Sequence, residues 1–323
     1  MDHTLRLRVA SAADIAARIR MLELVAESGE LPPFDAGSHI EFRTGNGLLR
    51  CYSLANDPAE RHRYVIAVLR EGDGSGWMHG VAPGAVVEGS VPRNGFALNE
   101  IASFHLLLAG GIGITPLRAM AYRLRAIGAP FRLVYCTRTP AAAAFASDLV
   151  AEFGDAVWLH YDEGDRARSL DLRALLAECA PGAHLYVCGP RGMIDAARAA
   201  AVHWPQDALH YEIFASPAVH SDGSAPAPRE SGDFAFEVEL RRSGKVITVG
   251  ADETILDAIL SAGIKAPHLC NEGWCGNCQC TLLEGRADHR DEVLSDEEKE
   301  ANTAIQICIS RAAPGERCLV IDR

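Results

Sequence analysis

The 323-residue chain contains no uninterrupted apolar run that approaches the roughly 18 residues of a membrane-spanning helix. Its first twenty residues, MDHTLRLRVASAADIAARIR, carry charges where a secretory signal would have an apolar segment. Basic residues are not in excess, because 31 Lys and Arg stand against 43 Asp and Glu and the net charge is −12. We therefore expect a cytoplasmic protein with no membrane partner and no nucleic-acid partner.

The composition is that of a globular protein large enough for more than one core. Hydrophobic residues make up 48% of the chain and charged residues 23%, which is an ordinary balance for a folded domain. At roughly 100 to 200 residues per domain, the length predicts two or three domains. Four of the ten cysteines fall within residues 270–280, a clustering that indicates metal or redox chemistry and not a disulfide framework.

The hydrophobic pattern divides the chain into three domains. Short apolar segments with turn residues between them predict an antiparallel β-barrel or sandwich over 1–102, in which the ambiguous segment 14–28 is predicted as a strand. Strands alternate with helices over 103–215, which predicts a Rossmann-like α/β domain with a parallel sheet. Its expected helices span 117–128, 141–153, 170–179 and 193–204. Residues 216–232, rich in Ser, Pro, Ala and Gly, predict a linker before a domain over 233–323 that begins with two strands and a helix.

The clustered cysteines follow a recognisable spacing. Three of them form C-x4-C-x2-C, and a fourth follows after twenty-nine intervening residues. The four are Cys270, Cys275, Cys278 and Cys308. This order is typical of a plant-type [2Fe-2S] cluster, and Gly273 and Gly276 permit the tight backbone curl that such a loop needs. The alternative is a structural zinc site, although zinc usually takes paired C-x2-C knuckles, and a second knuckle is missing here.

The segment IKAPHLCNEGWCGNCQCTLLEG resembles the plant-type ferredoxin loop. Its position after an α/β domain resembles the phthalate dioxygenase reductase family. This resemblance implies a β-barrel that binds FMN, a nucleotide domain that binds NADH and a ferredoxin domain of the α+β, β-grasp type, in that order. Cys280 matches none of the motif's ligands and is expected to be a small buried residue.

A flavin site is predicted in the barrel at Arg50-Cys51-Tyr52-Ser53-Leu54, which resembles the R-x-Y-S motif of ferredoxin reductases. It offers a guanidinium for a phosphate, an aromatic face for a ring and a hydroxyl for a ring heteroatom. A second segment, Gly74-Ser75-Gly76, precedes an expected helix and would present backbone N–H groups to a phosphate. By resemblance, Arg50 and this turn share the FMN phosphate, and Ser53 lies at the reactive edge of the flavin. The alternatives are a surface salt bridge for Arg50 and a core aromatic for Tyr52, and FMN instead of FAD rests on the resemblance alone.

A nucleotide site is predicted where an apolar strand meets a helix that starts near Pro116. The glycines of this loop, which resembles the GGIGITP loop of ferredoxin reductases, are Gly110, Gly111 and Gly113. They let the backbone approach a pyrophosphate, whose charge the helix dipole favours. The segment Cys188-Gly189-Pro190 matches the second nucleotide motif of that family, in which the cysteine lies near the nicotinamide. The alternative for Cys188 is a packed thiol at the end of a strand.

Three further residues have two interpretations each. Thr115 either points its hydroxyl toward the nicotinamide or caps the helix, and it could do both. Phe214 resembles the aromatic that the family keeps near the flavin, with core packing as the alternative. Arg138 stands where an adenosine ribose would lie, so it either holds a 2′-phosphate or caps a helix, and we expect NADH as the nucleotide.

Taken together, the resemblance implies a monomeric reductase in which NADH reduces FMN and the [2Fe-2S] cluster passes single electrons to a partner. That partner would be the Rieske oxygenase of an aromatic-ring dioxygenase or O-demethylase system. Residues 232–323 contain 10 Lys and Arg against 17 Asp and Glu, a net charge of −7, which favours docking on a basic face. One alternative is the reductase of a diiron or P450 oxygenase, where many chains place the ferredoxin first. Another is a non-catalytic redox sensor.

Overall fold

The computed structural model describes residues 4–45, 49–214, 233–264, 266–267, 273, 276, 278–291 and 293–323. The chain folds into two compact units, Met1–Phe214 and Ala215–Arg323. Unit 1 therefore contains both the strand-rich segment and the segment of alternating strands and helices. The predicted linker, residues 216–232, lies outside the described residues.

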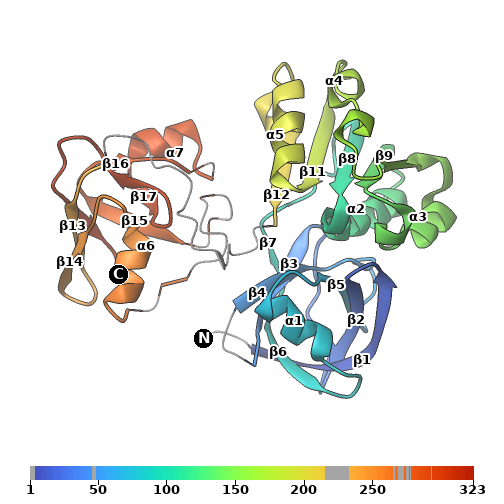
Figure 1. Ribbon diagram of the computed structural model, residues 1–323, viewed down its shortest axis with the longest axis horizontal. Helices are drawn as coiled ribbons and strands as arrows, with labels where there is room; N and C mark the ends of the chain where they lie inside the picture. Colours follow the sequence, from blue (N-terminus) through green and yellow to red (C-terminus); the bar gives the residue numbers. More distant parts are fainter. Residues whose placement is uncertain are drawn as a thin grey trace. The chain divides into compact units, whose positions relative to one another are not determined.

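The first part of unit 1 is an antiparallel barrel (Figure 1). Its elements are β1 (Thr4–Ala16), β2 (Ile19–Ala26), β3 (Ser38–Arg43), β4 (Leu49–Ser53), β5 (Tyr64–Leu69), α1 (Asp73–Gly80), β6 (Val86–Ser90) and β7 (Arg93–Asn94). The strands run in the order β4-β3-β6-β1-β2-β5, with β7 paired to β3. The amide of Ala55, just after β4, donates to the carbonyl of Val65 in β5 at 2.8 Å, which brings the two ends of this order together.

The strand prediction for the ambiguous segment 14–28 is confirmed. This segment supplies the end of β1 and all of β2, which pair as an antiparallel hairpin around the turn residues Ala17 and Arg18. Arg18 adopts a left-handed conformation with φ of 63°. The alternating side chains of β2 are divided between the barrel interior and its outside, so the sheet period outweighs the helix propensity of Ala, Arg and Leu.

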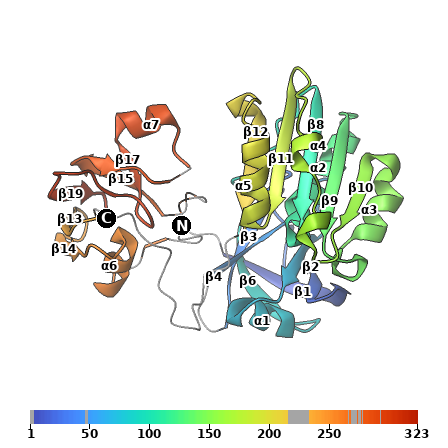
Figure 2. The same ribbon diagram turned by 45° about the horizontal axis from the view of Figure 1, so that its top comes forward.

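The second part of unit 1 is a five-stranded parallel sheet covered by helices on both faces (Figure 2). Its elements are β8 (Phe104–Gly110), α2 (Ile114–Ala126), β9 (Phe131–Thr137), α3 (Ala146–Phe153), β10 (Val157–Tyr161), α4 (Leu172–Leu175), β11 (Ala183–Gly189), α5 (Arg191–Ala200) and β12 (Leu209–Ile213). In the order β10-β9-β8-β11-β12, successive strands are added on one side of β8 and then on the other side, while all five strands stay parallel. In such doubly wound sheets, ligands bind at the carboxyl ends of the strands near this change of side.

Three of the predicted helices are shorter than expected, and the one expected over 193–204 spans Arg191–Ala200. The helix expected over 141–153 begins only at Ala146, because Pro140 starts a separate 3-10 turn and Phe145 has a left-handed φ of 60°. The helix expected over 170–179 is reduced to α4, whose N-cap Asp171 accepts from the amide of Ala174. Neither of these last two segments has a continuous apolar stripe, and helix propensity alone did not extend either helix to its predicted limits.

The barrel and the parallel sheet share one hydrophobic core. Barrel residues Ile19, Ala55 and Phe96 pack in the same cluster as Leu117 of α2 and Tyr135 of β9. The β1–β2 turn also donates from the Ala17 amide to the carbonyl of Ala141 at 2.7 Å. The opposite face of the sheet has a separate core beneath α4 and α5. The two sequence-predicted domains over 1–102 and 103–215 are therefore packed into one body, and the position of the boundary between them stays a prediction.

Unit 2 is a mixed sheet with a helix on one face. Its elements are β13 (Phe236–Leu240), β14 (Lys245–Val249), α6 (Ile255–Ser261), β15 (Gln279–Glu284), β16 (Ala287–Asp288), α7 (Asp296–Ala301), β17 (Ala304–Gln306), β18 (Arg311–Ala312) and β19 (Cys318–Ile321). The sheet order is β14-β13-β19-β15-β17, with β13 and β19 parallel. The predicted opening of two strands and a helix is confirmed, and α6 buries Ile255 and Ile259 against this sheet.

Within the described residues, the longest and most apolar helices still fall short of what is needed to cross a membrane.

A buried arginine ties the loops of unit 2 together. Arg311 donates from Nη2 to the carbonyls of Phe234 and Gly250, both at 2.9 Å, and from Nη1 to the carbonyl of Glu253. Arg311→Met should lower the free energy of unfolding of unit 2 by about 3 kcal/mol, because three partly buried carbonyls lose a charged donor and Asp233 loses an ion-pair partner. Hydrogen exchange at the amides of β13 and β19 measures this change. Exchange in the control Arg286→Met, at an exposed position, should match the wild type, and equal exchange in both variants would contradict the assignment.

Candidate active site and cofactor-binding residues

The predicted flavin segment carries two buried hydroxyl groups that need a partner. Tyr52 Oη and Ser53 Oγ are both buried and make no hydrogen bond to any described residue. Burial also raises the pKa of Tyr52, so its phenol stays protonated and can donate. Leu54 is fully buried, and its amide donates to the carbonyl of Ser38 at 2.8 Å. Because an unpartnered buried polar group is costly, these hydroxyls fit a bound ligand with polar atoms at this place.

Arg50 lies against the first turn of α1. A Cβ atom on Gly74 would come within 2.5 Å of Arg50 Nε, so this position accepts only glycine while the guanidinium stays in place. The helix begins at Asp73, so Gly74, Ser75 and Gly76 lie within its first turn and not before it as predicted. Glycine thus opens a cradle in which an arginine and a helix N-terminus meet, which fits a phosphate.

The donors of this turn are not all available. The Gly76 amide donates to the carbonyl of Gly72 at 2.7 Å, and the Ser75 hydroxyl accepts from the amides of Glu71 and Gly72. The Gly76 amide closes the first helical hydrogen bond, and a phosphate-binding role for Gly76 stays a prediction. The amides of Gly74 and Ser75 remain as the candidates.

The predicted nucleotide loop presses against the end of β11. A Cβ on Gly113 would overlap the backbone carbonyl of Cys188, and one on Gly110 would lie 2.7 Å from Cδ of Pro190. Gly111 adopts a φ of 55° that favours glycine. The two predicted nucleotide segments are thus in direct contact at the carboxyl edge of the sheet. Helix α2 starts at Ile114, two residues earlier than predicted, so Pro116 lies in its first turn, where the missing N–H group is harmless.

Thr115 and Cys188 lie on either side of this contact. The Thr115 hydroxyl donates to the carbonyl of Ile112 at 3.0 Å, whereas the N-cap of α2 is Gly113, so Thr115 does not cap the helix. Cys188 is fully buried in the shared core, and burial raises the pKa of its thiol, which therefore stays neutral. Cys188 is thus a packed thiol near the end of a strand, as the alternative interpretation expected. A place for Cys188 beside a nicotinamide stays a prediction.

Glu212 is a candidate functional residue that the sequence reasoning missed. It lies directly opposite Cys188 in the parallel pairing of β11 and β12. Its Oε2 atom is buried without a hydrogen-bond partner among the described residues, and burial raises its pKa to about 8. Ala55, which directly follows the flavin segment, packs in the same cluster as Ile114 and Cys188, so the flavin segment and the sheet's carboxyl edge are neighbours. The available signal was a carboxylate between Tyr211 and Ile213 in the segment HYEIF.

Phe214 and Arg138 both follow sheet strands at the same edge. Phe214 comes directly after β12 and is 37% exposed, so the alternative of core packing does not account for this aromatic residue. Arg138 comes directly after β9 and is exposed, and its carbonyl accepts from the amide of Glu163 at 2.7 Å. The N-cap of the following 3-10 turn is Thr139, so Arg138 is not its cap. Both side chains are available to a ligand, and their predicted roles stay predictions.

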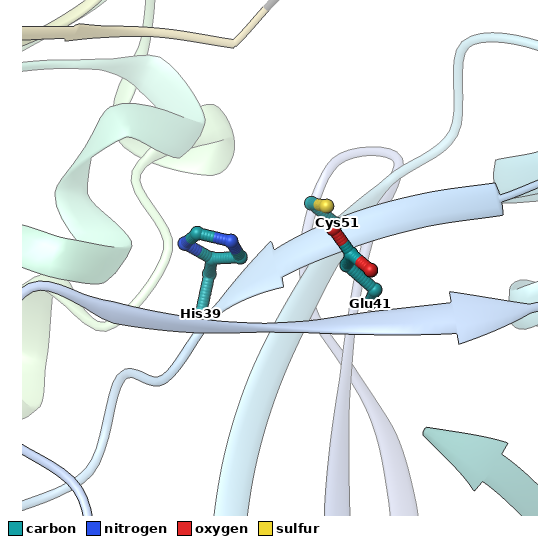
Figure 3. A group of neighbouring side chains, drawn as sticks. All are labelled: His39, Glu41 and Cys51. Atoms are coloured by element: carbon teal, nitrogen blue, oxygen red, sulfur yellow. The ribbon is translucent and has the colours of Figure 1, made fainter. Parts of the chain in front are cut away.

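A group of three potential metal ligands lies on one face of the β3–β4 pair (Figure 3). The ligand atoms of His39, Glu41 and Cys51 all lie within 4.8 Å of one another. However, Arg93 Nη1 donates to Glu41 Oε1 at 3.3 Å, and burial together with Arg93 lowers the pKa of His39. Burial raises the pKa of Cys51, which disfavours the thiolate that a metal needs. The guanidinium already balances this carboxylate, so the local charges disfavour a bound cation.

The described part of the cysteine motif fits a tightly enclosed cluster. Cys278, just before β15, and Cys308, just after β17, are both buried. Gly273 and Gly276 have φ values of 78° and 71°, as the predicted curl requires. Cys270 and Cys275 lie outside the described residues. Cys280 is buried as predicted, and its Sγ accepts from Arg323 Nε at 3.3 Å.

These structural features together define a class of protein. Unit 1 joins a barrel, whose two buried hydroxyls have no partner among the described residues, to a parallel sheet with a glycine loop at its carboxyl edge. Unit 2 carries the cysteine motif on a small mixed sheet. This combination is that of a reductase in which a flavin, a pyridine nucleotide and an iron–sulfur cluster are held by one chain.

Two families and several characterised proteins match the chain. Residues 107–199 match the oxidoreductase NAD-binding domain, and residues 238–313 match the 2Fe-2S iron-sulfur cluster binding domain. Phthalate dioxygenase reductase of Burkholderia cepacia is 40% identical over 99% of this chain and 98% of that protein. Vanillate O-demethylase oxidoreductase of Pseudomonas sp. (strain HR199 / DSM 7063) is 40% identical over 95% and 96%. The tert-butanol monooxygenase / tert-amyl alcohol desaturase reductase subunit of Aquincola tertiaricarbonis is 41% identical over 95% and 93%.

A solved structure confirms the fold over nearly the whole chain. Phthalate dioxygenase reductase, described as a modular structure for electron transfer from pyridine nucleotides to [2Fe-2S], is 39% identical with a TM-score of 0.72 over 99% of this chain and 98% of that one. The chain therefore belongs to the phthalate dioxygenase reductase family. It is an NADH-dependent flavin and iron–sulfur oxidoreductase that serves an oxygenase, and its cofactors are FMN, NADH and a [2Fe-2S] cluster.

A second solved structure corrects one sequence argument. An intact type IV self-sufficient cytochrome P450 monooxygenase is 35% identical, with a TM-score of 0.83, over 99% of this chain and 41% of that longer chain. The match includes the C-terminal cysteine motif of this chain. A C-terminal ferredoxin domain therefore does not exclude a P450 acceptor, contrary to the expectation from domain order.

Replacing Gly113 tests the contact between the nucleotide loop and β11. Gly113→Ala should lower the free energy of unfolding of unit 1 by about 2 to 4 kcal/mol, because the new methyl group meets backbone that cannot turn away. It should also weaken NAD⁺ binding at least tenfold. Thermal unfolding and a titration of the bound flavin's absorption with NAD⁺ measure the two effects. Gly192→Ala, where a Cβ meets nothing within 4 Å, is the matched control, and wild-type behaviour in both variants would refute the close contact.

The buried Glu212 carboxyl should make stability depend on pH. Its pKa lies at about 8 in the folded chain against 4.5 in the reference state, so the folded form holds a proton that the unfolded form has released. Stability should therefore fall as pH rises from about 5 to 8, by up to about 1.4 kcal/mol per pH unit from this group. Glu212→Gln should remove that slope, as measured by urea unfolding at several pH values. The exposed control Glu178→Gln should keep it, and identical slopes in all three proteins would rule out the buried proton.

Proposed function

We propose that this chain is the reductase that supplies single electrons from NADH to a Rieske-type oxygenase of an aromatic-ring dioxygenase or O-demethylase system. The observation that carries the proposal is the shared core of unit 1, in which Ala55, directly after the flavin segment, packs with Ile114 and Cys188 of the nucleotide edge. The hydroxyls of Tyr52 and Ser53, which have no partner among the described residues, lie in the same flavin segment. We further propose that the protein is a monomer, and its cytoplasmic location stays a prediction.

The flavin would be held at two ends by residues of the barrel. Arg50 and the amides of Gly74 and Ser75 would hold its phosphate, since the guanidinium lies against the first turn of α1. The Tyr52 and Ser53 hydroxyls would donate to polar atoms of the ring system, which would satisfy their buried donors. Leu54 would hold the segment in place from the barrel core, where its side chain is fully buried. The flavin supplies a two-electron acceptor for hydride that can release its electrons one at a time.

The nucleotide would lie along the carboxyl edge of the parallel sheet. The loop glycines Gly110, Gly111 and Gly113 would let the backbone approach the pyrophosphate, with the N-terminus of α2 and Pro116 behind it. Thr115 and the Cys188-Gly189-Pro190 turn would border the nicotinamide, and the exposed ring of Phe214 would shield the flavin until the nicotinamide replaces it. Arg138 would lie beside the adenosine ribose. Neutral Glu212 would offer a proton donor near the nicotinamide amide.

The cluster would be held by Cys270, Cys275, Cys278 and Cys308, of which the two described cysteines are already buried beside the sheet. Residues 232–323 carry a net charge of −7, from 10 Lys and Arg against 17 Asp and Glu. A basic face on the acceptor would therefore raise the rate of encounter, and more so at low ionic strength. This supports a separate protein acceptor that docks near the cluster.

A P450 acceptor is the second candidate, because a P450 monooxygenase chain contains a segment similar to this whole chain. The two candidates are separated by electron transfer to purified acceptors. NADH-driven reduction of a Rieske oxygenase, with little reduction of a P450 at equal concentration, supports the proposal. The reverse preference would replace it.

The cluster assignment is tested with one cysteine variant. Cys308→Ser should lose the visible absorption of the cluster while NADH still bleaches the flavin, because the thiolate ligand lies in unit 2 and the hydride site in unit 1. Reduction of cytochrome c should fall at least tenfold, and reduction of ferricyanide should stay within about twofold. The control Cys318→Ser lies in β19 and should keep both activities and the spectrum. Retained cluster absorption in the Cys308 variant, or zinc in place of iron in the wild type, would overturn the assignment.

A further inference from the structure

A buried arginine on α2 joins the nucleotide part of unit 1 to the backbone that follows the flavin segment. Arg118 is 9% exposed, and its Nη1 donates to the carbonyl of Ala55 at 2.6 Å. Ala55 is the residue directly after Leu54, and its own amide donates to Val65. Arg118 of α2 therefore crosses the shared core and binds the carbonyl of Ala55. The amide of the same residue is already hydrogen-bonded to β5 of the barrel.

The guanidinium is held in place from several directions. Its Nη2 donates to Tyr122 Oη at 2.9 Å, and Asp148 Oδ2 lies 3.9 Å away. The charged group also lies over the rings of Phe145, 4.5 Å from the centroid, and Tyr122, 4.9 Å away. Two ring contacts and two directed hydrogen bonds leave the side chain little freedom.

The backbone is distorted where Phe145 meets this arginine. Phe145 has a left-handed φ of 60°, a rare conformation for a bulky residue, and its side chain is buried. Such a conformation persists only where the surrounding structure over-determines it. Here it places the aromatic ring on the guanidinium at the start of α3, and the preceding 3-10 turn receives the Ala17 amide from the barrel.

Arg118 is also one helical turn from the nucleotide loop. It lies three residues after Thr115 and four after Ile114, the first residue of α2, so Thr115 and Arg118 share one side of the helix. The path from the loop to the flavin segment is therefore short: one turn of α2, one side chain and one peptide group. A displacement of Arg118 would shift the two segments relative to each other.

We propose that Arg118 is a positioning residue that sets the distance between the flavin segment, Arg50 to Leu54, and the nucleotide loop, Gly110 to Thr115. The proposal rests on the proposed function, because the two segments matter to each other only if hydride passes between their ligands. Hydride transfer needs donor and acceptor in a near-attack arrangement, and a misplacement of about 1 Å can lower its rate about 100-fold. Affinity for each ligand separately would change little, since Arg118 lies behind both sites.

The test compares three variants as full-length, cofactor-loaded proteins. Arg118→Met removes both hydrogen bonds with little change in length, Arg118→Lys keeps the charge but not the paired geometry, and Arg123→Met is the control on the same helix. Arg123 is an exposed partner of Glu100. Anaerobic mixing with NADH measures the rate of flavin reduction, and a titration with NAD⁺ measures affinity.

We expect flavin reduction to fall about 100-fold in Arg118→Met and about 10-fold in Arg118→Lys, with NAD⁺ affinity within threefold and flavin content unchanged. NADH deuterated at the transferred position should show a full primary isotope effect in Arg118→Met, because the chemical step is the one that slows. Arg123→Met should match the wild type. If Arg118→Met fails to fold, the lysine variant still carries the test.

A second readout does not depend on turnover. Hydrogen exchange measured by mass spectrometry should rise at least tenfold over residues 52–56 in Arg118→Met and stay unchanged in unit 2. Wild-type reduction rates together with a lowered melting temperature would make Arg118 a stabilising residue only and overturn the proposal. A wild-type protein whose flavin NADH does not reduce would instead overturn the proposed function, so the two failures are distinguishable.

Discussion

The rest of unit 1 depends on one constraint, the packing of the barrel directly on the face of the parallel sheet that carries α2. Residues of both parts contribute to one continuous cluster, from Ala55 and Phe96 on the barrel to Leu117 of α2 and Tyr135 of β9. Because protein interiors are close-packed, neither part can shift without opening a cavity. The carboxyl edge of the sheet is therefore held beside Ala55, the second residue after β4, and this packing brings the two ligand sites together.

Much of the architecture was predictable, because strand and helix periods differ and the motifs have fixed spacing. The order of barrel, parallel sheet and ferredoxin domain is confirmed, as is the strand over the ambiguous segment 14–28. Helix limits were predicted less well. Pro140 and the left-handed Phe145 delay the start of α3, and a helix expected from Leu and Ala content shrinks to α4. Local propensity does not report where tertiary contacts interrupt a helix.

The candidate site was predictable where glycine or cysteine marks it, and less so elsewhere. Close approaches at Gly74 and Gly113 follow the predicted motifs. The use of the Gly76 amide inside its own helix could not be read from the sequence, because it depends on the exact residue at which α1 starts. Glu212 and Arg118 were missed for a related reason. A charged residue in an apolar segment reveals its role only when the fold shows what faces it.

The hydroxyls of Tyr52 and Ser53, which have no partner in the described part of the chain, make the stability of the protein depend on bound flavin. A chain without flavin leaves these donors buried and unsatisfied, whereas a ligand that binds only the folded state stabilises it by mass action. Newly made chains in a cell short of flavin would therefore open more often and be degraded sooner. The amount of reductase that accumulates would then follow riboflavin availability without any change in gene expression.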